Sequence, residues 1–380
     1  MNVTDHTNYK NQLDSLFRTT TQTNGIHSAA AVVESLDGSF SWRQAYGQAD
    51  PSGRTMQVDT PFNIASVTKL LIAAAILRLS EEGRLDLDHP MVDYLPGELT
   101  ANLHRTKDGV DHTDKITLRH LLSHASGLPD YFEDAPKGEK RLADQMTTNA
   151  DEAWPIERIT AYVQEKLIAH FPPQDFGSKR IKVRYSDTNF QLLIAIISSV
   201  TGKGHNEVFK EFFYQPLNMG HTFLPGSDPL QPGEDEAVIW AGEDPMDLPI
   251  LLRSLGDVNS TLDDMLAFMR ALINGEAFIK EETALMMRQD WHTFGMPTSM
   301  MPLSPNWPIQ YGMGMMRFKI PSWMPPFQSI PAVIGHTGVS GSYLFYCPDL
   351  ELILVGTFNQ IAAAALPYRI IPKVLKLIGN

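Results

Sequence analysis

A serine and a lysine three residues apart stand at the start of an apolar run. Ser66 and Lys69 precede Leu70–Leu77, and the chain has no glycine or proline from there to Gly83. Such a run predicts a buried helix, and the loop residue Pro61 places the start of that helix near Ser66. Side chains three positions apart share one face of a helix, so Ser66 and Lys69 should be neighbours.

This spacing has a direct chemical use. A serine hydroxyl becomes a good nucleophile when a neighbouring base takes its proton, and a lysine whose charge is depleted can be that base. Free N–H groups at the helix start also favour developing negative charge. We therefore predict Ser66 as the nucleophile and Lys69 as its proton partner. Because S-x-x-K arises by chance about once in a chain of this length, as a helix cap and an exposed lysine, other motifs must support this interpretation.

Composition excludes several classes of function. A net charge of −13, from 31 basic and 44 acidic residues, and the lack of a basic run argue against binding to nucleic acids or anionic membranes. The single cysteine, Cys347, cannot form an internal disulfide and is expected to pack in the core. The N-terminus lacks the apolar segment of a secretory signal, and no run is long enough to span a membrane. We expect a soluble, cytoplasmic protein.

The order of elements predicts an α+β fold. Strand patterns lie near both ends of the chain and helical patterns lie between them, so one antiparallel sheet should form from both termini. We expect a sheet domain from residues 1–80 and 255–380, a mainly helical lobe from residues 81–254, and the active site between them. The elements expected are helices at 9–21, 117–123, 156–169, 189–200, 206–213 and 366–378, a hairpin at 28–46, and strands at 311–320, 333–335, 343–347 and 350–359.

Two local patterns complete this prediction. Residues 132–154 are charged and polar and contain Pro136 and Gly138, which is typical of a surface excursion. Ser260 or Thr261 should cap a further helix, because acidic residues follow in its first turn.

A second candidate segment is Tyr185-Ser186-Asp187, which lies directly before a predicted helix. A tyrosine near a lysine can share its proton, act as the base for a serine, and later protonate a leaving group. Taken alone, Tyr185 could equally be a packing residue, with Ser186 or Asp187 capping the helix.

A third candidate segment, Gly335-His336-Thr337-Gly338, lies among the C-terminal strands. Glycines let a substrate approach a strand edge closely, and an N–H group there can complete an oxyanion hole opposite the Ser66 N–H. His336 and Thr337 would then offer hydrogen bonds to the substrate. The alternative is a strand bend with a structural histidine.

The segment 117–130 contains His120 and His124 at helical spacing, which could be mistaken for a metal pair. No third ligand and no H-E-x-x-H pattern accompany them, so structural histidines are the better interpretation and no metal site is expected. The chain also lacks the G-x-S-x-G elbow, the P-loop and the dinucleotide-binding fingerprint.

Together these segments resemble the serine beta-lactamase and penicillin-recognising family, in particular its class C beta-lactamases, DD-peptidases and family VIII esterases. The resemblance spans about residues 25–360. The family's S-x-x-K, Y-x-N and K-T-G motifs correspond here to Ser66–Lys69, Tyr185–Asp187 and His336–Gly338. Arg119–Pro129 is similar to a loop and helix typical of the family.

The resemblance implies the roles of the site residues. Ser66 would form an acyl-enzyme, Lys69 and Tyr185 would handle the proton, and the N–H groups of Ser66 and Val339 would form the oxyanion hole. No metal or organic cofactor is implied. Contacts to the substrate are implied for Asp187, His336, Thr337 and Gly338.

Three features depart from the antibiotic-hydrolysing members. Asp187 stands where class C enzymes have an amide, and a carboxylate near Lys69 favours the charged lysine, which shifts the role of base towards Tyr185. His336 replaces a lysine whose positive charge would hold a β-lactam carboxylate. The third feature is the absence of a secretion signal. All three favour an intracellular esterase, amidase or aminopeptidase.

We therefore expect a serine hydrolase that acts on a small carboxylic ester. The alternatives are an amidase, D-amino-acid peptidase or beta-lactamase, and a binding or sensor protein that acylates slowly. Nine of the 17 methionines lie between Met286 and Met324, together with Trp291, Trp307 and Trp323. If this stretch lines the cleft rather than packing on the sheet edge, it predicts an apolar acyl or aryl group.

Overall fold

The computed structural model describes residues 3–146, 151–226, 235–246, 248–296, 308–320 and 330–379. Its helices are α1 Val3–Thr23, α2 Thr68–Glu81, α3 Gly97–Thr100, α4 Leu118–Leu122, α5 Leu142–Met146, α6 Ile156–Lys166, α7 Asp187–Thr201, α8 His205–Phe209, α9 Pro249–Leu255, α10 Leu262–Asn274, α11 Thr283–Met286 and α12 Pro367–Ile378. Its strands are β1 Ser28–Ser35, β2 Ser41–Gly47, β3 Phe62–Asn63, β4 Ile239–Ala241, β5 Asp244–Met246, β6 Asn259–Ser260, β7 His292–Thr293, β8 Ile309–Tyr311, β9 Met316–Phe318, β10 Val333–Thr337, β11 Tyr343–Cys347 and β12 Leu352–Thr357.

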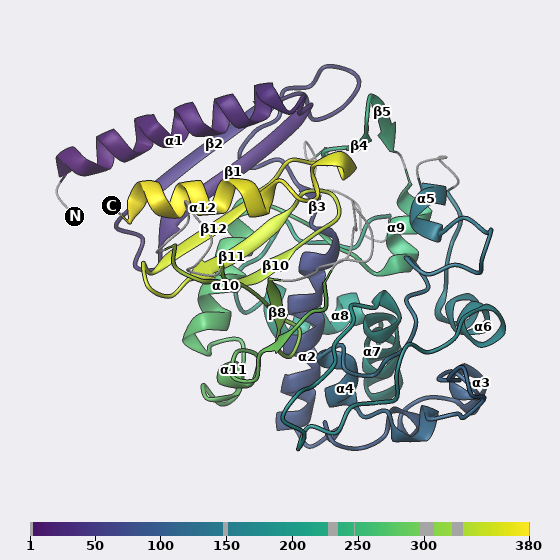
Figure 1. The fold of residues 1–380 in the computed structure, drawn as a ribbon. Coiled ribbons are helices and arrows are strands. Elements are labelled where there is room, and N and C mark those ends of the chain that lie inside the picture. Colours follow the sequence, from purple (N-terminus) through teal and green to yellow (C-terminus); the bar gives the residue numbers. More distant parts are fainter. Residues whose placement is uncertain are drawn as a thin grey trace.

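An eight-stranded antiparallel sheet joins the two ends of the chain (Figure 1). Its strand order is β2-β1-β12-β11-β10-β9-β8-β7, and Val32 of β1 lies opposite Val355 of β12. The predicted α+β fold, with a sheet from both termini and helices from the middle of the chain, is confirmed. The bounds of the two lobes stay a prediction.

The sheet separates two hydrophobic cores, because side chains alternate between its faces. Ala29, Ala31 and Val33 face the core that contains α1 and α12, which lie side by side over the sheet (Figure 1). Ala30 and Val32 face the second core, which contains α2 and α10. Burial on both faces explains why β1 is apolar over most of its length.

Helix α2 is the central helix of the second core. Every residue from Thr68 to Leu77 is buried, and the helix contacts α7, α8 and β10. A helix that is apolar all round needs neighbours on every side, and these elements supply them. A 3₁₀ turn, Ala65–Val67, precedes it, so the regular helix begins two residues after Ser66 rather than at it.

Most other predicted elements are present. The N-terminal helix, the hairpin and the closing helix occur, and Thr261 caps α10 by accepting the N–H of Asp264. Cys347 is buried in β11, as predicted. Within the described ranges, none of the helices has the length and apolar character needed to cross a bilayer.

One prediction about local structure is wrong and another holds only in part. The single strand expected over residues 311–320 is interrupted, because a turn at residues 312–315 separates β8 from β9. Gly314 has a φ of 72° there, and a Cβ atom at this position would overlap Ala73 of α2. The surface excursion predicted over residues 132–154 holds in part. Residues 137–140 are exposed, whereas Phe132 and Trp154 at its two ends are buried, and residues 147–150 lie outside the described residues.

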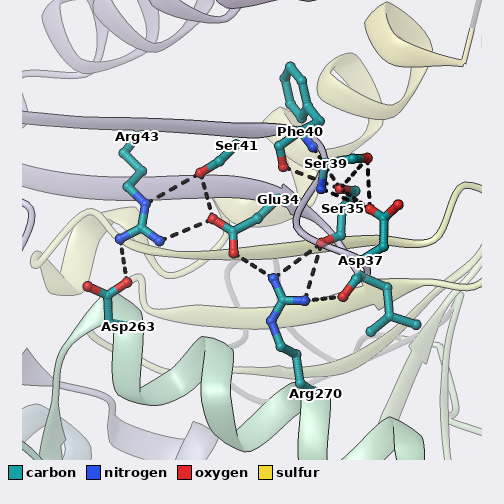
Figure 2. Close-up of polar contacts among 10 residues, drawn as sticks. Glu34, Ser35, Asp37, Ser39, Phe40, Ser41, Arg43, Asp263 and Arg270 are labelled. Atoms are coloured by element: carbon teal, nitrogen blue, oxygen red, sulfur yellow. Dashed lines mark hydrogen bonds and ion pairs between the residues drawn. The ribbon is translucent and has the colours of Figure 1, made fainter. Parts of the chain in front are cut away.

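A polar network fastens the β1–β2 hairpin to α10 (Figure 2). The Glu34 carboxylate accepts hydrogen bonds from Ser41 (2.5 Å), Arg43 (3.1 Å) and Arg270 (2.5 Å). Arg43 also pairs with Asp263 of α10. Burial raises the pKa of Glu34, but the bonds from these three donors outweigh burial and the pKa is lowered. Each charge in this network therefore has a protein partner.

Candidate active site

Ser66 is presented to the surface by a buried and strained loop. It is the only residue of Pro61–Leu77 that is not fully buried. The preceding Ala65 has a φ of 46°, a left-handed conformation that residues other than glycine rarely adopt. The Asn63 side chain accepts the Ala65 N–H at 3.0 Å and supports this conformation. Such strain persists only where surrounding contacts hold it, and it is frequent at active sites.

Those contacts come from two distant parts of the chain. Ser340 Oγ donates to the carbonyl of Asn63 (3.1 Å), and Ser342 Oγ donates to the carbonyl of Ile64 (2.7 Å). The Asn63 side chain donates to Asn259 of β6 (3.0 Å). The loop that carries the nucleophile is therefore fixed by the C-terminal strands and by β6.

Lys69 connects the nucleophile to a carboxylate. Its Nζ lies 3.1 Å from Ser66 Oγ and 2.6 Å from Asp187 Oδ1, the residue that begins α7. The Lys69 side chain is only 6% exposed. The predicted Ser66–Lys69 contact is thus present, and Asp187 completes a chain of three polar groups.

The charge of Lys69 follows from these neighbours. Burial lowers the pKa of Lys69, but the charges of Asp187 and Asp257 and the hydrogen bond to Asp187 outweigh burial and raise the pKa. Lys69 is therefore an ammonium at rest. An ammonium only donates hydrogen bonds, so Lys69 must lose a proton before it can accept one from Ser66.

Tyr185 lies two residues before the start of α7 and is buried against Lys69, whose Nζ is 5.3 Å from the centre of the tyrosine ring. Burial and the charge of Asp187 raise the pKa of Tyr185 well above its ordinary value, and a hydrogen bond with Ser66 offsets only part of this. Tyr185 is therefore a neutral phenol at rest. Loss of a proton from Lys69 or Tyr185 must precede attack, which should favour alkaline activity.

His124 holds the backbone on both sides of Tyr185. Its carbonyl accepts the Arg184 N–H (3.0 Å) and its Nδ1 accepts the Ser186 N–H (3.2 Å). The ring lies 4.4 Å from the Tyr185 ring, centre to centre. Burial and the charge of Lys69 lower the pKa of His124 well below its ordinary value, so it remains a neutral acceptor.

His120 also has a structural position. Its Nδ1 accepts the Thr117 N–H (3.0 Å) in a capping box, and its Nε2 donates to the carbonyl of Gln174 (2.7 Å). In the described part of the chain, no group of three or more His, Cys, Asp or Glu side chains could hold a metal ion.

The residues of the C-terminal motif His336–Gly338 have two different environments: some line the cavity and one lies in the core. His336 is fully buried, with Nε2 3.1 Å from the Tyr311 hydroxyl and Nδ1 2.7 Å from the carbonyl of Thr337. It does not line the cavity, whereas Thr337 and Gly338 do. Burial and the charge of Lys69 lower the pKa of His336 to about 3, so its ring is neutral. Direct contact of His336 with a substrate stays a prediction.

Gly338 and Val339 bring a strand end against the nucleophile loop. A Cβ atom on Gly338 would lie 2.7 Å from the carbonyl oxygen of Ile64, so only glycine permits this approach. Val339 lines the cavity, and within the described ranges no backbone acceptor takes its N–H. A free N–H at this position has the character required of an oxyanion donor.

These residues open into a cavity of about 610 Å³. Its walls are mainly apolar, which suits the body of a small organic substrate. Of the methionine-rich stretch, Met316 lines the cavity, whereas Trp307 and Trp323 lie outside the described residues, so their role stays a prediction. The apolar lining includes Phe132, Phe190, Ile194, Leu252, Leu255 and Phe318.

Four charged residues of the cavity wall had no motif to mark them: Glu133, Arg141, Asp257 and Arg369. Glu133 and Arg141 form an ion pair of 2.9 Å within the segment predicted to lie at the surface. In the sequence, Asp257 lies between Gly256 and the buried residue Val258 and belongs to no recognisable motif. Its position directly before a buried run was the only available signal.

Comparison with known proteins agrees with this geometry. The family model described as Beta-lactamase matches residues 13–366. The D-alanyl-D-alanine-carboxypeptidase/endopeptidase AmpH of Escherichia coli is 24% identical over 345 residues, covering 90% of this chain and 81% of that protein. Esterase EstB of Burkholderia gladioli is 40% identical over 118 residues, covering 31% of this chain and 28% of EstB.

A solved structure shares the fold over nearly the whole chain. The D-amino acid amidase of Ochrobactrum anthropi SV3, in complex with D-phenylalanine, superposes with a TM-score of 0.72. It is 20% identical, and the alignment covers 97% of this chain and 99% of the amidase. At this identity the likeness describes the fold alone.

Proposed function

Because the chain belongs to the beta-lactamase family and is a serine hydrolase, we propose that it hydrolyses small carboxylic esters through an acyl-enzyme on Ser66. The observation that carries this proposal is the chain from Ser66 Oγ through Lys69 Nζ to Asp187 Oδ1, at 3.1 and 2.6 Å, at the edge of an apolar cavity. It supplies a nucleophile, a proton partner and a wall that suits an apolar acyl group.

The reaction follows from these groups. After Lys69 or Tyr185 has lost a proton, that group takes the proton of Ser66 as Oγ attacks the ester carbonyl. The N–H groups of Ser66 and Val339 stabilise the oxyanion. The intermediate collapses, the carbon–oxygen bond to the alcohol breaks, and the alcohol leaves with the proton. Water then attacks the acyl-enzyme by the same route and releases the acid and Ser66.

The charge of the site supports an ester more than a β-lactam. His336 stands where the resemblance expects a lysine, and its ring is neutral and bonded to Tyr311. A β-lactam carboxylate would therefore lack the positive charge that a lysine offers at this position. Asp187 adds a negative charge beside the nucleophile. A substrate without a carboxylate avoids both difficulties.

Amide hydrolysis is the second candidate. Its support is Tyr185, a neutral phenol with a Ser66 hydrogen bond, which can protonate an amine leaving group as the intermediate collapses. Two relatives also point to amide or peptide substrates, since AmpH is a carboxypeptidase and endopeptidase and the solved amidase acts on amino acid amides.

The test is a turnover assay on the wild type and on Ser66→Ala in parallel. The substrates are aryl esters with short and medium acyl chains, a D-amino acid amide and a chromogenic cephalosporin. Ester turnover that is lost in Ser66→Ala, with the cephalosporin untouched, is the expected result. Faster turnover of the amide than of any ester would reverse the order of the two candidates, and hydrolysis of the cephalosporin would overturn the argument from His336.

A further inference from the structure

Asp257 is a carboxylate at the catalytic cavity that the reaction above does not use. It lies between α9 and β6, and the next residue fixes its backbone. The Val258 N–H donates to Thr68 Oγ1 (3.2 Å), and the Val258 carbonyl accepts the Ile64 N–H (3.0 Å). Asp257 is thereby held beside the loop that carries Ser66.

The Asp257 carboxylate has no partner in the part of the chain that the structure describes. Among the described residues it makes no hydrogen bond and no ion pair, although Asp187 in the same wall pairs with Lys69 at 2.6 Å. Burial raises the pKa of Asp257 to about 6, with the charge of Lys69 lowering it and that of Asp187 raising it. Asp257 is therefore ionised at neutral pH. Asp257 is half-buried at the cavity surface. A carboxylate with a shifted pKa in a cleft, without a partner among the described residues, is frequent at functional sites.

The charges around Asp257 do not balance. Lys69 supplies one positive charge, whereas Asp187 and Asp257 supply two negative charges, so the group carries −1 when Asp257 is ionised. The other cations of the cavity wall do not correct this. Arg141 is paired with Glu133, and Arg369 is exposed to solvent.

We propose that Asp257 binds a protonated amino group of the substrate, so that the cavity selects esters or amides whose acyl part carries an ammonium group next to an apolar body. This inference rests on the proposed function. A monovalent ammonium fits one carboxylate, whereas a metal ion needs several ligands, and no such group exists among the described residues.

The cavity wall suits the rest of such a ligand. Burial raises the pKa of the Tyr131 phenol, and the charges of Asp187, Asp130 and Asp257 raise it further, in that order. Tyr131 therefore lies within electrostatic range of Asp257. The aromatic rings of Tyr131, Phe132 and Phe190 line the same cavity. An ammonium at Asp257 would be attracted by such ring faces, and an apolar side chain would fill the remaining volume.

Binding without turnover tests this inference independently of the reaction. In the Ser66→Ala protein, titration calorimetry would compare 2-phenylethylammonium with 2-phenylethanol, which has nearly the same shape and no charge. The amine should bind at least about tenfold more tightly, as expected of a charge-assisted hydrogen bond. In Ser66→Ala/Asp257→Asn this preference should disappear.

The control is Ser66→Ala/Glu133→Gln, which removes a paired carboxylate of the same wall and should keep the preference for the amine. Circular dichroism melting curves verify that each variant is folded. An amine that binds no better than the alcohol would overturn the inference, as would a preference that survives in Asp257→Asn or that is lost equally in Glu133→Gln.

Turnover by the wild type separates the two proposals. The matched substrates are methyl 3-amino-3-phenylpropionate and methyl 3-phenylpropionate, and the amine-bearing ester should have the higher kcat/KM by about tenfold. If both are hydrolysed equally, the assignment of Asp257 fails and the ester hydrolase stands. If neither is hydrolysed while Asp257-dependent amine binding persists, the proposed reaction fails and the ammonium site stands.

Discussion

The β1–β2 hairpin and the catalytic cavity both contain carboxylates and cations, but the carboxylates are paired completely at the hairpin and incompletely at the cavity. At the hairpin, Glu34 accepts bonds from Ser41 and from two arginines, so its charge is fully matched (Figure 2). At the cavity, Lys69 is matched by Asp187, while Asp257 has no partner among the described residues.

The difference separates polar groups that stabilise the fold from those available for chemistry. A matched network lowers the pKa of its carboxylate and stabilises the folded state, as at Glu34. An unmatched carboxylate has a raised pKa and destabilises the folded state, as at Asp257. Substitution of the hairpin carboxylate should therefore lower stability and leave activity unchanged. Substitutions at the cavity should change activity, and loss of the Asp257 charge should raise stability.

The largest expected effect is on activity at Ser66. Ser66→Ala should lower kcat/KM for an aryl ester at least ~10⁴-fold, because no other group can form the acyl-enzyme. Steady-state kinetics checks this. Ser35→Ala, which removes a hydroxyl from the hairpin network, is the matched control and should change kcat/KM by less than about twofold. Activity that survives in Ser66→Ala would mean that the nucleophile lies elsewhere.

The next effect is on the pH dependence of the reaction. Asp187→Asn removes the carboxylate that raises the pKa of Lys69, so Lys69 should lose its proton at lower pH. The rising limb of kcat/KM against pH should move down by about 1 pH unit or more. Asp263→Asn, a carboxylate of the hairpin network, should leave the limb in place. An unmoved limb in Asp187→Asn would show that Lys69 is not the group that titrates.

A loss of stability is expected at Glu34. Glu34→Gln should lower the free energy of unfolding by about 1–3 kcal/mol, because it removes the charge that pairs with Arg43 and Arg270. The folded pKa of Glu34 lies below its ordinary value of 4.5, so this stability is present above that pH and fades as the pH falls through the folded pKa. Urea denaturation at neutral and acidic pH measures both effects. An equal loss of unfolding free energy at both pH values would contradict the ion-pair explanation. The kcat of Glu34→Gln should equal that of the wild type.

A smaller gain of stability is expected at Asp257. The pKa of Asp257 in the folded state is about 6, above its ordinary value of 3.8. Ionisation of Asp257 therefore destabilises the folded state above about pH 6. The effect is absent at low pH, where the carboxyl is protonated in both the folded and the unfolded state. Asp257→Asn should raise the free energy of unfolding by about 1–2 kcal/mol near pH 8 and by nearly nothing below about pH 4. Urea denaturation at the two pH values checks this. A destabilised variant at the higher pH would mean that Asp257 is matched by a partner.

Local sequence predicts the parts of the site that local structure builds. Ser66 and Lys69 meet because helical geometry brings neighbours three apart together. Tyr185 lies before a helix, as its segment predicted. The ion pair between Lys69 and Asp187 joins two helices and depends on how α2 packs against α7, which the resemblance indicated only through the order of its motifs.

The rest of the site depends on long-range packing that no spacing rule records. His336 was identified by type, but its ring direction is set by Tyr311, which lies on a hairpin that the sequence pattern had merged into one strand. Asp257 was missed because a single aspartate after a glycine has no motif. Glu133 was missed because its charged surroundings resembled a surface loop.

The pairing of β1 with β12 has a consequence for biosynthesis. Ser66 is synthesised long before the Ser340 and Ser342 hydroxyls that hold its loop and before the Val339 N–H. The central strands cannot complete the sheet until these later residues have been added. A growing or prematurely terminated chain therefore carries its nucleophile without the second half of the site, so hydrolysis begins only when synthesis of the sheet is finished.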